Sequence, residues 1–372
     1  MNLKTKPINC LGHTAVSEIT RCKPIPGNKG RCLMTAGSYV VCWALLLIMW
    51  VTVGGGIVGA DEKPKRPPMP LINAPLLFNT KQADAVMASL QLFPATSAWH
   101  EDISKLPVQP NSTRMIEGIG ANKNLAWNLD MGFVIVPGNQ KKIAVKLVLY
   151  PDESDPGPYP MPDNAPIEGW PLMGGDLANV QRVGGGDRHV IVLDPVNGRL
   201  FEFYQGRRTD GGWQAACAAV FDITSNKLRP PGWTSSDAAG LPILPAVVRY
   251  DECERGFIDH ALRFTVRRTR KSYLYPATHQ AGRTTEIDVP AMGERFRLKA
   301  GVDVSHFPPY ARAIAQALKT YGMLVADNGG DWRISVAPDD RIQGLDALRA
   351  LKGSDFEVVQ STGEKAGPRA GR

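Results

Sequence analysis

The longest apolar stretch of the chain runs from Tyr39 to Val58 and is followed by Gly59, Ala60 and an abruptly polar segment. The stretch is long enough to cross a bilayer. Its second half is rich in glycine, and Val58 and Ala60 are spaced as a signal-peptidase site requires. Residues 1–60 are therefore predicted to be a signal peptide cleaved after Ala60, with an uncleaved single-pass signal anchor as the alternative.

The polar segment that follows predicts a spacer and then one large folded domain. Residues 61–75 are charged and rich in proline, which is typical of an extended spacer. Prolines and glycines are spread along residues 76–360, a pattern typical of many short strands and turns in a single globular domain. The polar tail, residues 361–372, is expected to be disordered.

Helical periodicity is clearest at the two ends of the predicted domain. Thr80 is expected to cap a short helix whose apolar stripe contains Ala83, Val86, Met87 and Leu90. Pro308 and Pro309 precede the periodic segment YARAIAQALKTY, and the following Gly322 suits the end of a helix. The segment GLDALRALKG predicts a further short helix.

Strand patterns dominate the middle of the chain. Residues 189–204 contain two apolar runs around Asn197 and Gly198, which predicts a β-hairpin, and the first run is apolar on both faces, as a strand buried between layers would be. Residues 260–266 alternate, so one face is expected to turn inward and the other, with Arg263, to meet solvent or ligand. Residues 133–136, 142–150 and 323–327 are further predicted strands. The predicted fold is mostly β, a large β-sandwich or jelly-roll-like domain with a few peripheral α-helices.

Most of the net positive charge of the chain lies in the predicted signal segment. The formal net charge is +7 with a pI near 9.1, but residues 1–60 contain six basic residues and one acidic residue, which leaves only +2 on residues 61–372. Such a bias keeps the N-terminus in the cytoplasm and residues 61–372 outside it. A nearly neutral domain argues against nucleic acid as a partner.

Four of the six cysteines also fall within residues 1–60, so only Cys217 and Cys253 remain after cleavage. In an exported chain these two could form one disulfide bond, and two buried free thiols are an equally good interpretation.

A series of motifs occupies the second half of the chain: GWTSSDAAGLPILPAVVRYDE, IDHALRFTV, YLYPATH, GERFRLKAGVD and LKTYGMLVADNGG. The series resembles a group of uncharacterised exported microbial β-rich proteins, over roughly residues 100–360. The resemblance implies an exported β-rich domain without a particular activity. Members of the group are often attached to extracellular or carbohydrate-related modules, which favours a carbohydrate function by association.

The common enzyme signatures are not found after the predicted signal segment. Residues 61–372 contain no GxSxG, HExxH, CxxC, Walker or GxGxxG motif. The usual sequence signals of α/β-hydrolases, zinc peptidases and nucleotide-binding proteins are therefore not supported.

Polar residues gather instead at the ends of predicted strands. Glycoside cleavage needs one carboxylic acid as proton donor and a second as nucleophile or base. Glu202 alternates with aromatic residues on its strand, as a cleft carboxylate would, although a solvent-facing glutamate has the same pattern. Histidines with a carboxylate could equally form a zinc or iron site, or be satisfied core residues. The candidate catalytic residues are His260, Arg263, His279 and Asp327, with one carboxylate from Asp187 or Glu202.

Three further features bear on ligands. Asp237, in the loop TSSDAAG, is expected to cap a turn. The tryptophans, with Tyr273 and Tyr275, could stack on sugar rings, although most are expected to be core or loop anchors. A basic run at residues 267–271 could bind an acidic polysaccharide or lipid headgroup, and a solvated turn is the simpler interpretation.

These observations lead to one functional hypothesis and one alternative. The chain is predicted to be an exported carbohydrate-active protein, a polysaccharide-cleaving enzyme that acts in the periplasm, outside the cell or on a membrane anchor. The alternative is a non-catalytic surface module that binds glycan or protein. A polysaccharide or envelope glycan is the expected partner, nucleic acid is not, and a membrane is involved only through residues 39–58 if they are not cleaved. The sequence does not indicate a particular cofactor or metal.

Overall fold

The computed structural model describes residues 66–363. The chain divides into two units, Met1–Glu62 and Lys63–Arg372, and all described residues belong to the second. The predicted signal segment with its cleavage site after Ala60, and the tail from residue 364 onward, lie outside the described residues. Among residues 66–363, no helix combines the length and apolarity that a membrane span requires.

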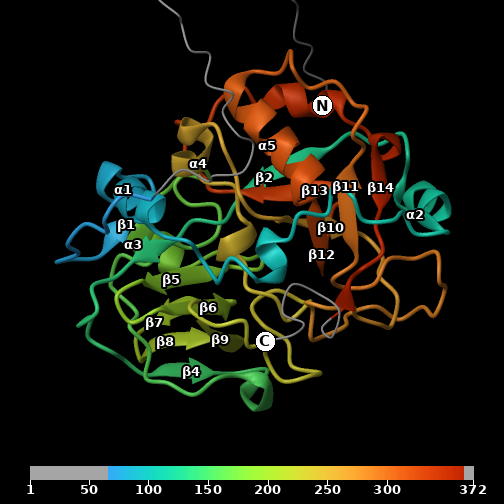
Figure 1. The fold of residues 1–372 in the computed structure, drawn as a ribbon. Coiled ribbons are helices and arrows are strands. Elements are labelled where there is room, and N and C mark those ends of the chain that lie inside the picture. Colours follow the sequence, from blue (N-terminus) through green and yellow to red (C-terminus); the bar gives the residue numbers. More distant parts are fainter. Residues whose placement is uncertain (1–65, 364–372) are drawn as a thin grey trace, which may run out of the picture. The chain divides into compact units, whose positions relative to one another are not determined.

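The described residues are mostly β, with fourteen strands in three sheets and few helices (Figure 1). The five-stranded sheet has the order β1 (Leu76–Leu77), β3 (Val134–Ile135), β5 (Val190–Asp194), β6 (Arg199–Tyr204), β9 (Cys217–Asp222). The six-stranded sheet has the order β14 (Phe356–Val358), β11 (Arg295–Leu298), β12 (Met323–Asn328), β10 (Leu262–Val266), β13 (Arg333–Val336), β2 (Ala126–Leu129). The three-stranded sheet has the order β4 (Val145–Leu147), β8 (Gly212–Ala215), β7 (Arg207–Thr209).

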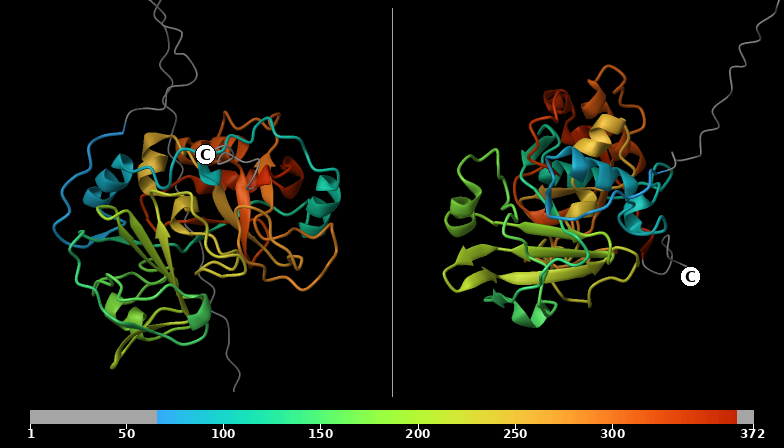
Figure 2. Two further views of the ribbon diagram at one scale, coloured as in Figure 1. Left: turned by 60° about the horizontal axis from the view of Figure 1, so that its bottom comes forward. Right: turned by 90° about the vertical axis from the view of Figure 1, so that its left-hand side faces the viewer.

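Each sheet contains both parallel and antiparallel neighbours. The parallel pairs are β3 with β5, β10 with β12, β13 with β2, and β4 with β8. The prediction of a β-rich domain with few helices is confirmed at this level. In Figure 2 the green strands β4–β9 and the orange-to-red strands of the six-stranded sheet form two separate regions.

Within residues 66–363 the sheets are accompanied by five α-helices: α1 (Lys81–Ser89), α2 (Ser112–Ile119), α3 (Leu177–Arg182), α4 (Tyr250–Arg255) and α5 (Pro309–Thr320). The predicted cap of α1 is confirmed, because the Thr80 side chain accepts a hydrogen bond from the Ala83 N–H at 3.3 Å. Gly322 follows α5 with a φ of +68°, the left-handed conformation that glycine adopts most easily. The segment GLDALRALKG forms a 3₁₀ helix, Leu345–Ala350, instead of an α-helix.

The predicted hairpin is formed by β5 and β6, which pair antiparallel from Val190 with Phe203 to Asp194 with Arg199. Gly198 has a φ of +65° in the connecting turn. Strand β5 is buried throughout: Ile191 and Leu193 belong to the main core, whereas Val190 and Val192 belong to a second core beside the three-stranded sheet. Burial between two layers, predicted from its two apolar faces, is confirmed.

Strand β10 differs from its predicted two-faced character. All five residues are buried, because β12 and β13 pair with it on both edges and other segments cover both faces. Arg263 does not reach solvent: its side chain forms an ion pair with Asp237 at 2.6 Å. Asp237 is therefore the partner of a buried cation, not only the turn cap that its loop suggested.

The structure also shows the contacts of the spacer and the state of the two cysteines. Ile72 is buried in the main core, and Arg66 forms an ion pair with Asp259 at 2.8 Å, so the spacer contacts the domain at these two residues while most of residues 66–75 stay exposed. Cys217 and Cys253 are buried free thiols. Of the two interpretations of this cysteine pair, the structure supports free thiols.

Candidate functional site

A polar cavity of about 320 Å³ lies where the ends of strands from two different sheets meet. Tyr204 ends β6 of the five-stranded sheet, and Asp327 and Asn328 end β12 of the six-stranded sheet. Loop residues complete the wall. The full lining is Tyr150, Glu153, Asp187, Tyr204, Thr234, Ser235, Ser236, Ala238, His279, Ala281, Asp327 and Asn328.

The loop that carries Ser236 is held in place on both sides. The Ser235 hydroxyl accepts a hydrogen bond from the Asp237 N–H at 2.9 Å and donates to the Leu241 carbonyl at 2.6 Å. Asp237 receives two hydrogen bonds from Arg263, from Nε at 2.9 Å and from Nη2 at 2.6 Å. Since Asp237 and Arg263 are both buried, this two-point contact fixes the loop as well as balancing charge.

Asp327 is the most perturbed carboxyl group on the cavity wall. Burial raises its pKa to about 8, and repulsion from Asp237 acts in the same direction, while Arg263 opposes both. Its carboxyl group is therefore largely protonated near neutral pH and can donate a proton. Asp187, in contrast, is an exposed residue of the same cavity.

Tyr204 and His279 extend the hydrogen-bonding surface of the cavity. The Tyr204 hydroxyl lies 3.4 Å from Asp187 Oδ1, and burial, followed by the charge of Asp187, raises the pKa of Tyr204 to about 12. Nδ1 of His279 lies 2.7 Å from the Ala238 carbonyl oxygen. A carbonyl oxygen only accepts, so Nδ1 carries the proton and Nε2 is left as an acceptor in the neutral ring.

Behind Ser236, three titratable groups meet. A ring nitrogen of His189 and one oxygen from each of Glu168 and Asp187 lie within 4.8 Å of one another. Nδ1 of His189 is 2.9 Å from the Ser236 hydroxyl oxygen. Burial lowers the pKa of His189 to about 3, so its ring is neutral at physiological pH. One imidazole and two carboxylates are also a donor set that a divalent metal could use.

The cluster contains more carboxyl groups than cations. Burial raises the pKa of Glu168, with Asp187 adding to the effect, and raises that of Asp130 to about 7. Oδ1 of Asp130 is buried and has no hydrogen-bond partner within the described residues. Arg263 lowers the pKa of Glu168 and of Asp130, but burial is the larger effect at both carboxyl groups, so both pKa values stay raised.

The structure brings together three of the six sequence-predicted catalytic residues. Asp187, His279 and Asp327 line the polar cavity, and Arg263 lies behind it as the partner of Asp237. The remaining two have buried partners elsewhere. Nε2 of His260 is 2.9 Å from Glu252 Oε1, and the Glu202 carboxylate accepts hydrogen bonds from the N–H groups of Ile243 and Leu244 at 2.9 Å.

A larger groove of about 870 Å³ lies next to the polar cavity. Consecutive residues line the two: Trp233 and Thr278 line the groove, and the next residues, Thr234 and His279, line the cavity. Tyr273 of the same groove is 37% exposed, which leaves its ring accessible.

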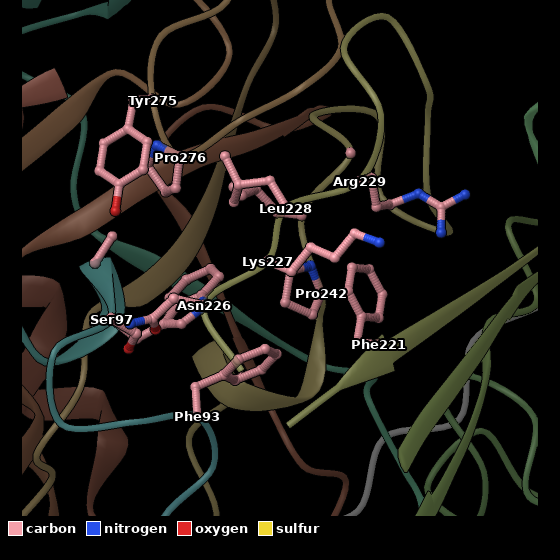
Figure 3. Close-up of a pocket in the computed structure, with 14 residues that line it drawn as sticks. Phe93, Ser97, Phe221, Asn226, Lys227, Leu228, Arg229, Pro242, Tyr275 and Pro276 are labelled. Atoms are coloured by element: carbon pink, nitrogen blue, oxygen red, sulfur yellow. The ribbon is translucent and has the colours of Figure 1, made fainter. Parts of the chain in front are cut away.

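The pocket in Figure 3 is too small for a substrate. Its volume is about 30 Å³, enough for little more than one water molecule. Phe93, Phe221 and Tyr275 are among its lining residues, and Lys227 and Arg229 belong to the wall that it shares with the large groove.

Sequence reasoning did not identify Ser236 or Asp130. Ser236 is 47 positions from its partner His189, so no local motif marks the pair. The pair of serines in the loop TSSDAAG, directly before Asp237, is the one sequence signal that points to Ser236.

Comparison of the chain with protein families, curated proteins and solved structures found no match.

Proposed function

We propose that the chain is an exported carbohydrate-active enzyme that cleaves a polysaccharide in the polar cavity. The observation that carries the proposal is the pairing of two unlike carboxyl groups on one cavity wall: Asp327, whose pKa is raised to about 8, and the exposed Asp187. Environments that separate two carboxyl groups in this way suit an acid and a base in one reaction.

In this proposal Asp327 donates a proton to the glycosidic oxygen as the bond breaks. Asp187, in the same cavity, acts as base toward water or as nucleophile toward the sugar carbon. Tyr204, His279 and Asn328 offer hydrogen bonds to sugar hydroxyls, because all three line the same cavity.

The large groove supplies room for the rest of a polymer. Trp233 and Tyr273 line it, and aromatic faces stack on sugar rings. Since consecutive residues line the groove and the cavity, the proposal has a glycan chain bound along the groove place one sugar at Asp327.

The test measures release of new reducing ends, or of unsaturated products, from a panel of neutral and acidic polysaccharides. We expect Asp327→Asn and Asp187→Asn each to lower the rate by about 100-fold or more, the usual contribution of a general acid or base. Asp210→Asn is the matched control, because its side chain is fully exposed in a surface ion pair with Arg182. Unchanged rates in both cavity variants would refute the assignment.

The groove also favours a second function, a non-catalytic module that binds glycan. In that case Trp233→Ala abolishes retention on an insoluble glycan, whereas the intact protein releases neither reducing ends nor unsaturated products. Retention combined with product release supports the enzyme instead.

Three further expectations belong to this proposal. Export through residues 1–60 gives the enzyme access to extracellular or envelope glycan, as the resemblance to exported microbial proteins implies. A sandwich or jelly-roll arrangement of the sheets is the finer form of the β-rich fold. The third expectation is that nucleic acid is not a partner. Export, the sandwich or jelly-roll arrangement and the lack of a nucleic-acid partner all stay predictions.

A further inference from the structure

Ser236 has the surroundings of a nucleophile. It lines the polar cavity, and its hydroxyl oxygen lies 2.9 Å from Nδ1 of His189. Within residues 66–363 the hydroxyl has no other hydrogen-bond partner, so its proton points to Nδ1. The neutral ring then carries its own proton on Nε2.

Two carboxyl groups stand beside the same imidazole. Glu168 and Asp187 each place an oxygen within 4.8 Å of a His189 ring nitrogen. Glu168 is tied to His189 through the backbone as well: its N–H donates to the His189 carbonyl at 2.9 Å, and its Oε2 accepts from the His189 N–H at 3.3 Å. An imidazole that takes up a proton is stabilised by such neighbours.

The loop around Ser236 is held by hydrogen bonds and has unpaired backbone donors. Ser235 and Asp237 fix the loop through the Leu241 carbonyl and Arg263. Within the described part of the chain, the N–H groups of Ser236 and Ala238 donate to no protein acceptor. Two unpaired amide donors next to a nucleophile are the kind of group that stabilises a developing oxyanion.

The cavity lining indicates the class of ester. Ala238 and Ala281 are the only aliphatic side chains of the lining, and the remaining residues carry hydroxyl, carboxyl, amide or imidazole groups. A cavity of about 320 Å³ with this lining suits a polyhydroxylated alcohol and a short acyl group, not a long hydrocarbon chain.

We propose that Ser236 and His189 form a nucleophile–base pair that removes short acyl groups, such as acetyl, from hydroxyls of the carbohydrate in the polar cavity. This proposal depends on the proposed function in one respect: a carbohydrate must occupy the polar cavity. The sequence around Ser236, TSSDAAG, has no GxSxG elbow, so the pair is recognised by geometry and not by motif.

The reaction proceeds in two steps. The Ser236 oxygen bonds to the acyl carbon while Nδ1 of His189 takes the hydroxyl proton, and the sugar oxygen leaves with that proton. Water then attacks the acyl–Ser236 ester, its proton passes to Nδ1, and the carboxylic acid leaves as the proton returns to Ser236. No oxidant, reductant or co-reactant other than water is consumed.

The first experiment labels the full chain with a fluorophosphonate, which bonds covalently to activated serine with loss of fluoride. Digestion and mass spectrometry of the unmodified protein identify the labelled residue without the need for any variant. We expect about one label per chain, at Ser236, no label there in Ser236→Ala, and labelling slowed about 100-fold or more in His189→Asn. Ser104→Ala, an exposed serine, is the matched control.

The second experiment measures acetate release from 4-nitrophenyl acetate and from an acetylated polysaccharide. Release from both, lost in Ser236→Ala, supports the proposal. Labelling and 4-nitrophenyl acetate turnover without any action on the polysaccharide keep the Ser236 pair but refute a carbohydrate substrate. Absence of label from Ser236, or hydrolysis that a chelator abolishes and zinc restores, overturns the pair in favour of an inert serine or a metal at Glu168, Asp187 and His189.

Discussion

Glu202 links the folded state of this protein to pH. Its side chain is fully buried, and burial raises its pKa from 4.5 to about 8, although hydrogen bonds from the Ile243 and Leu244 N–H groups oppose the shift. Between these two values the folded protein keeps a proton that the unfolded chain releases. The stability that this proton contributes is complete below pH 4.5 and is lost as the pH rises to about 8.

The size of the effect follows from the shift. One pKa unit corresponds to about 1.4 kcal/mol, so the full shift corresponds to roughly 5 kcal/mol of unfolding free energy. A neutral glutamine at position 202 carries no such dependence. Its carbonyl oxygen can accept the two hydrogen bonds that Oε1 accepts, and removal of the acceptor at Oε2 costs about 1 kcal/mol.

The assay is urea denaturation of wild type and Glu202→Gln at several pH values from 5 to 9. We expect the variant to be about equal to or slightly less stable than wild type at pH 5, and more stable by several kcal/mol at pH 9. The exposed Glu117→Gln serves as the control and should follow wild type throughout. A difference between wild type and Glu202→Gln that changes by less than about 1 kcal/mol across this range would refute the reasoning.

Three other substitutions test the fold around the site. Asp237→Ala leaves the cation of Arg263 buried and unpaired, and should lower the unfolding free energy by about 3 to 5 kcal/mol in urea, with much of the loss recovered when Arg263→Leu is added. Gly322→Ala would place a Cβ 2.2 Å from the Phe296 carbonyl oxygen at a φ of +68°, and calorimetry should show a loss of more than about 2 kcal/mol. Thr80→Ala removes the cap of α1 and should cost about 1 kcal/mol in the same calorimetric measurement, so an unchanged melting temperature would contradict it.

Local patterns predicted the local elements well. Thr80, Gly198 and Gly322 lie where capping and turn chemistry placed them, because these preferences act over a few residues. The sheet order could not be predicted in the same way. The strand neighbours β2 and β13 are about two hundred positions apart, and nothing in either segment specifies a parallel partner.

The burial of Arg263 shows why the alternation of residues along a strand can predict solvent exposure wrongly near a polar site. An arginine alternating with apolar residues is typical of a strand with one solvated face. Asp237, 26 positions away, supplies a buried partner and turns that face into core. The sequence contained both residues, but their contact depends on a loop between two sheets that periodicity does not describe.

Contacts with residues distant in the sequence also determine which carboxyl groups can act on a substrate. Glu202 and Asp327 both have raised pKa values near 8 and both end up protonated near neutral pH. Only Asp327 lines a cavity, whereas Glu202 is closed in by the backbone of Ile243 and Leu244. A raised pKa therefore distinguishes buried carboxyl groups from solvent-exposed ones. Access to the cavity then distinguishes Asp327, which can donate a proton to a substrate, from Glu202, which only makes the stability of the fold depend on pH.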